Sequence, residues 1–220
     1  MKRVLITGGS RGIGKAIADV FRSRDWEVLT PTRNEMDLAD SLSIASYCES
    51  IDGPIDAIVN NAGINNIATI DKLSDEMLEE MLQVNLKAPV QITRCLQDNL
   101  KMNSIAHVVN VSSIWGFVSK EGRLGYAAAK TGIIGVTRTM ALEFGKYNVL
   151  VNAVAPGFVN TELTKQNNTP EQIAEIEAGL PLKRMAEPEE IAKFVYFLAS
   201  DENTFITGQT ILIDGGYTCQ

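Results

Sequence analysis

The stretch Thr7-Gly8-Gly9-Ser10-Arg11-Gly12-Ile13-Gly14 follows a short β-rich run and opens a helical pattern. Glycine at these places permits a tight turn, and it lets backbone N–H groups approach a pyrophosphate at the positive end of the helix. Many glycine-rich turns only join two elements, but the position at the first strand–helix junction strengthens the functional reading. The stretch therefore predicts a dinucleotide-binding βαβ unit.

Short apolar runs alternate with longer helical patterns along all 220 residues. This alternation predicts an α/β fold, a doubly wound Rossmann sheet of parallel strands with helices on both faces. The strands are nearly continuously apolar, which is typical of a sheet buried on both faces. We expect strands at residues 3–7, 27–30, 57–60, 106–111, 149–154 and 210–213, and helices at 11–24, 74–100, 124–146 and 189–200. Residues 1–220 are expected to form a single domain, since no linker or repeat interrupts the pattern.

One segment departs from this alternation. Only residues 31–35 separate the second strand from another expected strand at Met36-Asp37-Leu38. A parallel crossover that contains a helix needs about a dozen residues, so the second crossover helix is missing or truncated. Either residues 36–38 form a stub of a strand or something else covers that sheet edge. We expect the stub, followed by a helix over residues 41–50.

Composition narrows the function. The formal charge of −7 argues against a nucleic-acid-binding face, which needs clustered Lys and Arg. One histidine and three scattered cysteines offer no ligand set for a metal, and a reducing cytoplasm is the expected compartment. The apolar run at the N-terminus is shorter than the roughly seven residues of a signal peptide. No run approaches the roughly eighteen residues of a membrane span, so no membrane partner is expected.

The end of the second strand bears on the choice of coenzyme. NAD-specific sites place an acidic residue there for the ribose 2′-OH, whereas an arginine accommodates a 2′-phosphate. Thr30-Pro31-Thr32-Arg33 contains no acid, and the first one that follows is Glu35. Arg33 and Arg11 are therefore expected to hold the phosphate of NADP(H). The alternative is that both arginines are solvated surface charges.

Tyr126 and Lys130 are four residues apart at the start of a helical pattern, which places the phenol and the ammonium on one face. A general acid works best with a pKa near the operating pH, and a neighbouring cation favours phenolate. Lys130 is therefore expected to lower the pKa of Tyr126. Such a pair by itself is more often a surface pair. Support comes from Ser113, which follows a buried strand and so lies at the carboxyl edge of the sheet, where open α/β folds bind ligands.

Three further polar features lie near this edge. Ser112 is expected only to bond the backbone. Asn60-Asn61-Ala62-Gly63 arrives at the same edge from another strand. Asn85 lies inside a helical pattern although Asn is a poor helix former, so it is either functional or a buried, hydrogen-bonded amide.

Taken in order along essentially the whole chain, these motifs resemble the short-chain dehydrogenase/reductase family. The glycine stretch matches the family's cofactor motif, and residues 60–63 match its fourth-strand motif. The segment that closes over the nicotinamide is matched by Pro156-Gly157, Val159 and Thr161. The catalytic tetrad is matched by Asn85, Ser113, Tyr126 and Lys130, with the family's spacing from Ser113 to Tyr126.

The resemblance implies an oxidoreductase that interconverts a carbonyl and a secondary alcohol by hydride transfer with NADP(H). It implies that Tyr126 protonates the carbonyl oxygen, that Ser113 hydrogen-bonds this oxygen, and that Lys130 binds the nicotinamide ribose and tunes Tyr126. Asn85 is expected to hold a water that links Lys130 to solvent. The implied cofactor contacts are Gly8, Ser10, Arg11, Gly12, Ile13, Gly14, Arg33, Asp37, Leu38, Asn61, Ala62, Gly63, Tyr126, Lys130, Val159 and Thr161.

Residues 161–182 are polar and contain a short helical pattern near 171–178. They are expected to form a lid over the substrate, the alternative being an ordinary surface insertion. The apolar residues that the lid offers are Leu163, Ile173, Ile176 and Leu180.

The stretch from Pro181 to Ala192 is similar to the 3-oxoacyl-acyl-carrier-protein reductases of the family. Those reductases carry basic residues for the acidic carrier where this chain has Ser104 and Tyr147, which weakens the carrier-protein reading, although Lys101 and Lys146 lie close by. The family is usually homotetrameric through its fourth and fifth helices and C-terminal strand, so a homotetramer or homodimer is expected.

Two other functions compete with this reading. A nucleotide-sugar epimerase or dehydratase of the family's extended branch usually has two residues after the first glycine, whereas this chain has three before Gly12. It also carries a larger C-terminal domain. A non-catalytic NADP-binding sensor usually lacks the Tyr or the Lys, and both are present here.

Overall fold

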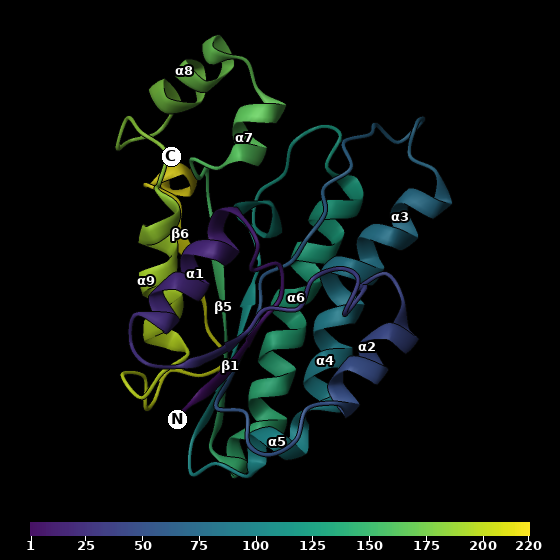
Figure 1. Ribbon diagram of the computed structural model, residues 1–220. Coiled ribbons are helices and arrows are strands. Elements are labelled where there is room, and N and C mark those ends of the chain that lie inside the picture. Colours follow the sequence, from purple (N-terminus) through teal and green to yellow (C-terminus); the bar gives the residue numbers. More distant parts are fainter.

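A parallel β-sheet forms the centre of the molecule (Figure 1). The computed structural model describes residues 1–220, except for the side chains of Leu163 and Asn167. The strands are β1 (Arg3–Ile6), β2 (Glu27–Leu29), β3 (Ala57–Asn60), β4 (Ala106–Val111), β5 (Val149–Pro156) and β6 (Thr210–Ile213). Their order across the sheet is β2-β1-β3-β4-β5-β6, and all neighbours are parallel. The predicted doubly wound α/β fold is confirmed.

The order of the strands locates the binding edge. From β1 the chain moves outward to β2, and then returns to place β3 on the other side of β1. Such a reversal opens a crevice at the carboxyl ends of β1 and β3, where ligands bind in open α/β sheets. The residues of β4 and β5 are all buried, because helices cover both faces of the sheet.

The helices form two layers around the sheet. They are α1 (Gly12–Arg22), α2 (Ser41–Glu49), α3 (Asp75–Leu82), α4 (Ala88–Cys95), α5 (Gln97–Lys101), α6 (Leu124–Phe144), α7 (Glu162–Asn167), α8 (Pro170–Gly179) and α9 (Pro188–Leu198). One core lies between the sheet and α1 and α9, and the other lies between the sheet and α2, α4 and α6. Figure 1 shows these two groups on opposite faces, with α7 and α8 beyond one end of the sheet. None of the described helices is long and apolar enough to cross a membrane.

The prediction of a strand stub at residues 36–38 is wrong. The chain between β2 and α2 forms turns, in which the Met36 N–H donates to the Thr32 carbonyl at 3.0 Å. The Asp37 N–H is bonded to the Ser43 hydroxyl at 2.9 Å, so it is not available for a sheet ladder. Met36 is buried in the second core and thus anchors the segment by its side chain. The helix expected over residues 41–50 is confirmed as α2, which Asp40 caps.

The long helix expected over residues 74–100 is divided. Ser74 caps α3, a π-helical turn follows at Gln83–Lys87, and α4 and α5 continue the path. A π turn inserts an extra residue and frequently marks a functional site. Asn85 lies in this turn and is buried.

Candidate active site

The glycine turn between β1 and α1 has no room for a side chain at Gly9 or Gly14. Gly8 and Gly12 have φ of 68° and 54°, in the left-handed region that favours glycine. A Cβ on Gly14 would lie 2.1 Å from the Gly8 carbonyl oxygen. No described side chain caps the first turn of α1, and this turn carries no acidic residue. Its N–H groups and its positive dipole end therefore fit a pyrophosphate.

The segment after β3 is fastened to this turn. The Thr7 hydroxyl accepts hydrogen bonds from the N–H groups of Asn61 and Ala62, both at 3.0 Å. The Asn61 side chain in turn donates to the Thr7 carbonyl at 3.0 Å. The two motifs, far apart in sequence, thus form one continuous surface at the crevice between β1 and β3.

The far end of the crevice is formed by the chain after β2. A Cβ on Gly9 would lie 2.5 Å from Thr30 Cγ2, so the glycine turn abuts the end of this strand. The Glu35 carboxylate accepts from the N–H and the hydroxyl of Thr32, at 2.7 and 2.8 Å, and so folds back onto its own loop. Arg33 is exposed and pairs with Asp37 at 3.2 Å.

Two other arginines, Arg11 and Arg22, belong to α1, the helix next to the end of β2. Arg11 is exposed at the N-cap of α1. The Arg22 guanidinium lies 3.5 Å from the Thr30 hydroxyl. The sequence analysis did not single out Arg22 as a residue of this site. The signal that would have found Arg22 is its place on the last turn of a helix that packs directly against the second strand.

Ser113 and Tyr126 meet at the carboxyl edge of β4. Ser113 is buried two residues beyond the strand, and Tyr126 is half-buried on the first turn of α6. Burial raises the pKa of the Tyr126 phenol, while the Ser113 hydroxyl and the Arg123 charge act in the opposite direction. The prediction that Ser112 bonds the backbone is confirmed, since its hydroxyl donates to the Lys130 carbonyl at 2.8 Å.

Lys130 lies one turn after Tyr126 and is buried. Its Nζ donates to the Val111 carbonyl at 2.7 Å and lies 5.5 Å from the centroid of the Tyr126 ring. Burial lowers the pKa of Lys130 to about 8, because the ammonium loses its hydration. The prediction that Lys130 lowers the pKa of Tyr126 is therefore wrong for this structure. Spacing in the sequence revealed the pair but not the burial of both groups, which dominates.

Asn85 reaches the same place from the π turn. Its side chain accepts from the Ile64 N–H at 3.0 Å and donates to the Ile64 carbonyl at 2.9 Å. A Cβ on Gly63 would lie 2.6 Å from Asn85 Oδ1 and 3.5 Å from Lys130 Nζ. Gly63 is thus the close contact that lets Asn85 and Lys130 converge. The amide is buried and hydrogen-bonded, and it also borders the predicted catalytic group.

The segment after β5 closes the site from another side. Val159 is buried and forms an isolated bridge to Ala186. Thr161 caps α7, and its Cγ2 would lie 3.5 Å from a Cβ on Gly12. The segment that begins at Pro156 therefore reaches back to the glycine turn of β1.

An aromatic cluster that the sequence analysis missed lies next to Ser113. Trp115, Phe158 and Tyr217 contact one another edge to face, with ring centroids 5.4–6.3 Å apart. All three rings are partly exposed, so they offer an apolar wall to a bound molecule. They come from three distant parts of the chain, and no local pattern connects them.

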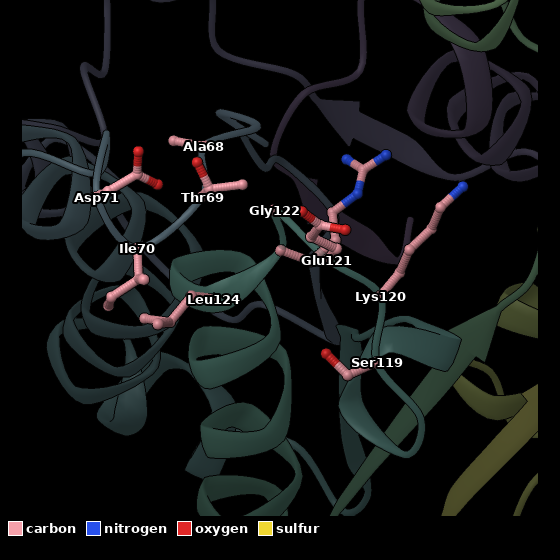
Figure 2. Close-up of a pocket in the computed structure, with 10 residues that line it drawn as sticks. Ala68, Thr69, Ile70, Asp71, Ser119, Lys120, Glu121, Gly122 and Leu124 are labelled. Atoms are coloured by element: carbon pink, nitrogen blue, oxygen red, sulfur yellow. The ribbon is translucent and has the colours of Figure 1, made fainter.

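An open pocket of about 540 Å³ lies beside the start of α6 (Figure 2). One side is formed by residues 68–71 and the other by residues 119–124, and the Ala68 N–H donates to the Gly122 carbonyl at 3.1 Å between them. Figure 2 shows Asp71, Thr69 and Ile70 on the first side and Ser119, Lys120 and Glu121 on the second. The last residue that lines the pocket is Leu124, two residues before Tyr126 on the first turn of α6, so the pocket adjoins the helix end that carries the predicted catalytic group.

The buried ammonium of Lys130 makes stability depend on pH. Its pKa falls from 10.5 to about 8 on folding, so the folded state is penalised wherever the lysine must be charged, which is below about pH 8. The penalty diminishes as the pH rises from about 8 towards 10.5, because the folded state then holds fewer protons than the unfolded chain. We expect Lys130→Met to be more stable than wild type at pH 7 by on the order of 1–3 kcal/mol.

Urea denaturation of both proteins at several pH values checks this. The advantage of Lys130→Met should shrink above about pH 8 by roughly 1.4 kcal/mol per pH unit. An advantage that is the same at pH 7 and pH 9.5, or a variant less stable at pH 7, would contradict the account.

The sheet order and the glycine turn place the chain in the class of doubly wound dinucleotide-binding proteins. A family model described as enoyl-(acyl carrier protein) reductase matches residues 34–218. The chain belongs to the short-chain dehydrogenase/reductase family, as the resemblance of its motifs predicted.

Its relatives differ in substrate and coenzyme. The 3-oxoacyl-(acyl-carrier-protein) reductase of Vibrio cholerae is 34% identical over 98% of this chain and 96% of its own. A solved structure from Beutenbergia cavernae, named as a candidate gluconate 5-dehydrogenase with bound NADP, is 31% identical and superposes with a TM-score of 0.94, covering 100% and 97% of the two chains. A 4-hydroxyisoleucine dehydrogenase complexed with NADH is 30% identical with a TM-score of 0.93, and both chains are fully covered. Membership of the family therefore leaves room for different substrates and for either coenzyme.

Proposed function

We propose that the chain is an NADP(H)-dependent oxidoreductase that interconverts a carbonyl and a secondary alcohol. The observation that carries this proposal is the meeting of Tyr126, Ser113 and Lys130 at the carboxyl edge of the sheet, beside the glycine turn. Bound NADPH supplies the hydride, and the protein supplies orientation and electrostatics.

Each polar group has one role in this proposal. Tyr126 holds its proton at neutral pH, because a phenol ordinarily has a pKa of about 10 and burial raises the pKa of Tyr126 further. It donates this proton to the carbonyl oxygen during reduction. The Ser113 hydroxyl donates a hydrogen bond to the same oxygen as negative charge develops on it. Lys130 binds the hydroxyls of the nicotinamide ribose, and with a pKa of about 8 it exchanges protons readily near neutral pH. Asn85 holds a water that connects Lys130 to solvent.

The proposed cofactor contacts follow the crevice. The glycine turn and Ser10 take the pyrophosphate, Asp37 and Leu38 flank the adenine, and residues 61–63 flank the adenosine ribose. Val159 and Thr161 lie over the nicotinamide, which the approach of Thr161 to Gly12 supports.

The arginines after β2 support NADP(H) over NAD(H). Glu35 is the first acidic residue after the end of β2, and its carboxylate is bonded to Thr32 instead of being left to accept from a ribose hydroxyl. Arg33 and Arg11 supply cations for a 2′-phosphate. Arg22 adds a third cation, although it already pairs with Asp19 at 3.2 Å. Among the described residues Arg33 bonds through its Nε alone, so its Nη groups are available to a phosphate. The ion pair with Asp37 weakens the attraction of Arg33 for a phosphate, but it also orients the guanidinium.

We therefore expect a marked preference for NADPH over NADH in kcat/KM. Arg33→Met should lower kcat/KM for NADPH by roughly tenfold, as expected for the loss of a charge-assisted hydrogen bond at a solvent-exposed site. The value for NADH should change by less than about twofold by the same argument. Arg94→Met, an exposed arginine of α4, is the matched control and should have no effect. Equal kcat/KM for the two coenzymes in wild type would contradict the assignment.

We propose that residues 1–220 act as a single nucleotide-binding domain with residues 161–182 as a lid over the substrate. The lid comprises α7 and α8, and α8 buries none of its side chains, all of which are described. Leu180 anchors its end in the interior. A segment with so few buried contacts opens at low cost in free energy. Leu163, one of the apolar lid residues expected from sequence, lies outside the described side chains.

We also propose a cytoplasmic homotetramer or homodimer. Leu142 of α6 is 84% exposed, and β6 is an edge strand whose apolar residues are only partly buried. A second copy of the chain that packs on α6 and β6 would remove these apolar side chains from water. Light scattering of the purified chain tests this, and a monomer at micromolar concentration would contradict it.

One observation favours an acyl-carrier protein as the substrate carrier. Lys101 and Lys146 both lie over the Tyr147 ring, 4.8 and 4.9 Å from its centroid. Asn148, the residue after Tyr147, donates from its side-chain amide to the Ser104 carbonyl at 2.6 Å. Two cations therefore converge where the related reductases carry basic residues. Screening NADPH oxidation with ketones, aldehydes, acetoacetyl thioesters and keto-sugars separates a carrier-bound thioester from a free carbonyl compound as the substrate.

A further inference from the structure

Arg123 holds a charge that no described carboxylate neutralises. It is half-buried at the N-cap of α6, and its Nε is buried with no hydrogen-bond partner among the described residues. It forms no ion pair with any described carboxylate, although Asp71 and Glu121 line the same pocket. Burial lowers the pKa of Arg123, so the guanidinium is partly stripped of its water. A desolvated and unpaired cation is costly, which points to a partner outside the chain.

The position of Arg123 connects the pocket to the proposed catalytic group. It lines the pocket, and it is the N-cap of α6, three residues before Tyr126, so both residues lie at the same end of this helix. Each affects the other's charge: the Arg123 charge lowers the pKa of Tyr126, and Tyr126 raises that of Arg123. A molecule whose carbonyl contacts Tyr126 can therefore reach Arg123 with a group only a few bonds away.

The surroundings favour an anion there. The first turn of α6 carries no acidic residue, and no described side chain caps it, so its free N–H groups face the same end of the helix. The net charge of −7 repels anions from the molecule as a whole, so an anionic substrate needs a local cation. A guanidinium presents parallel N–H donors that match the two oxygens of a carboxylate.

We infer that Arg123 binds the carboxylate of the substrate, so that the enzyme acts on short oxo acids and the corresponding hydroxy acids. This inference rests on the proposed function of Tyr126 and specifies its substrate class. The carboxylate pairs with Arg123, while the carbonyl of the same molecule contacts Tyr126 and Ser113. A neutral thioester lacks the group that Arg123 recognises.

The test compares acids with their own neutral esters. Pyruvate, acetoacetate and levulinate are each compared with their own methyl ester. The three acids differ in the number of carbon atoms between the carbonyl and the carboxylate. Wild type should prefer at least one acid over its ester in kcat/KM by about tenfold or more, as a desolvated charge-assisted pair provides. Arg123→Met should remove this preference by lowering the value for the acid by about tenfold to a hundredfold, with the ester changed by less than about threefold. Arg123→Lys should retain part of the preference.

Lys120→Met is the matched control, because Lys120 lines the same pocket but is exposed. It should leave the preference intact. Wild type that prefers every ester, or a loss in Lys120→Met as large as in Arg123→Met, would overturn the inference and leave the proposed function standing.

A binding readout separates the inference from catalysis. Butyrate has the carboxylate but no carbonyl to reduce. It should raise the melting temperature of the NADPH complex of wild type and of Tyr126→Phe, but not that of Arg123→Met. If no carbonyl compound is reduced while butyrate binds through Arg123, the proposed function fails and the anion site stands. If butyrate stabilises wild type and Arg123→Met equally, the anion site fails.

Discussion

Tyr126→Phe should lose turnover by at least a hundredfold, and up to about ten-thousandfold, while it binds NADPH as tightly as wild type. The expected loss is that of a positioned general acid. Tyr126 is half-buried beside Ser113, and its raised pKa keeps the proton on the phenol at neutral pH. Phenylalanine preserves the ring and its packing near Lys130 and removes only the proton that the carbonyl oxygen needs.

The direction of the reaction determines its pH dependence. Reduction uses the protonated phenol and should be sustained through neutral pH, whereas oxidation needs the phenolate and should accelerate as the pH rises. Tyr196→Phe is the control, because Tyr196 lies on α9 and packs against Phe21 and Trp26 on the face of the sheet opposite α6, and it should keep full activity. Substantial reductase activity in Tyr126→Phe, with normal NADPH binding, would remove Tyr126 from the mechanism.

Gly14→Ala should abolish NADPH binding and destabilise the fold by at least about 1–3 kcal/mol, the cost of overpacking a well-packed site. The added Cβ would lie 2.1 Å from the Gly8 carbonyl oxygen and 2.4 Å from Asn61 Nδ2. Relief of both contacts requires the glycine turn to separate from the segment after β3, and these two segments together form the proposed cofactor surface. Urea denaturation and fluorescence titration with NADPH measure the two effects.

Gly135→Ala is the matched control on α6. Apart from its own stretch of helix, no described atom lies within 4 Å of the Cβ that it would add, so alanine should be neutral or stabilise the helix by about 0.5–1 kcal/mol. NADPH binding should not change. A Gly14→Ala protein that binds NADPH like wild type would show that the turn does not approach the cofactor closely, and the proposed binding mode would be wrong.

The sheet and most of the candidate site could be predicted from sequence. The runs at 57–60, 106–111 and 210–213 agree with β3, β4 and β6 to the residue, because continuous apolar segments bounded by polar residues have few other solutions in an α/β protein. The glycine turn, Ser113, Tyr126 and Lys130 follow from their places at strand and helix ends. These are local features, and local spacing describes them well.

What could not be predicted depends on distant contacts. Residues 36–38 are apolar enough for a strand. They form no strand because the Asp37 N–H donates to the Ser43 hydroxyl and the Met36 side chain is buried in the core. The pKa of Tyr126 is raised rather than lowered because burial outweighs the spacing to Lys130. The Arg123 guanidinium, whose Nε has no partner among the described residues, depends on how loops fold over the site, as do the contacts among Trp115, Phe158 and Tyr217.

The central claim is hydride transfer between a coenzyme and a carbonyl carbon with a proton from Tyr126. NADPH deuterated at the nicotinamide C4 tests it most directly, with the oxo acids, esters, thioesters and keto-sugars above as acceptors and mass spectrometry of the products. The account predicts an alcohol that carries one deuterium on the former carbonyl carbon in wild type, and almost none in Tyr126→Phe. An enzyme that binds NADPH tightly yet yields no deuterated alcohol from any acceptor would contradict it.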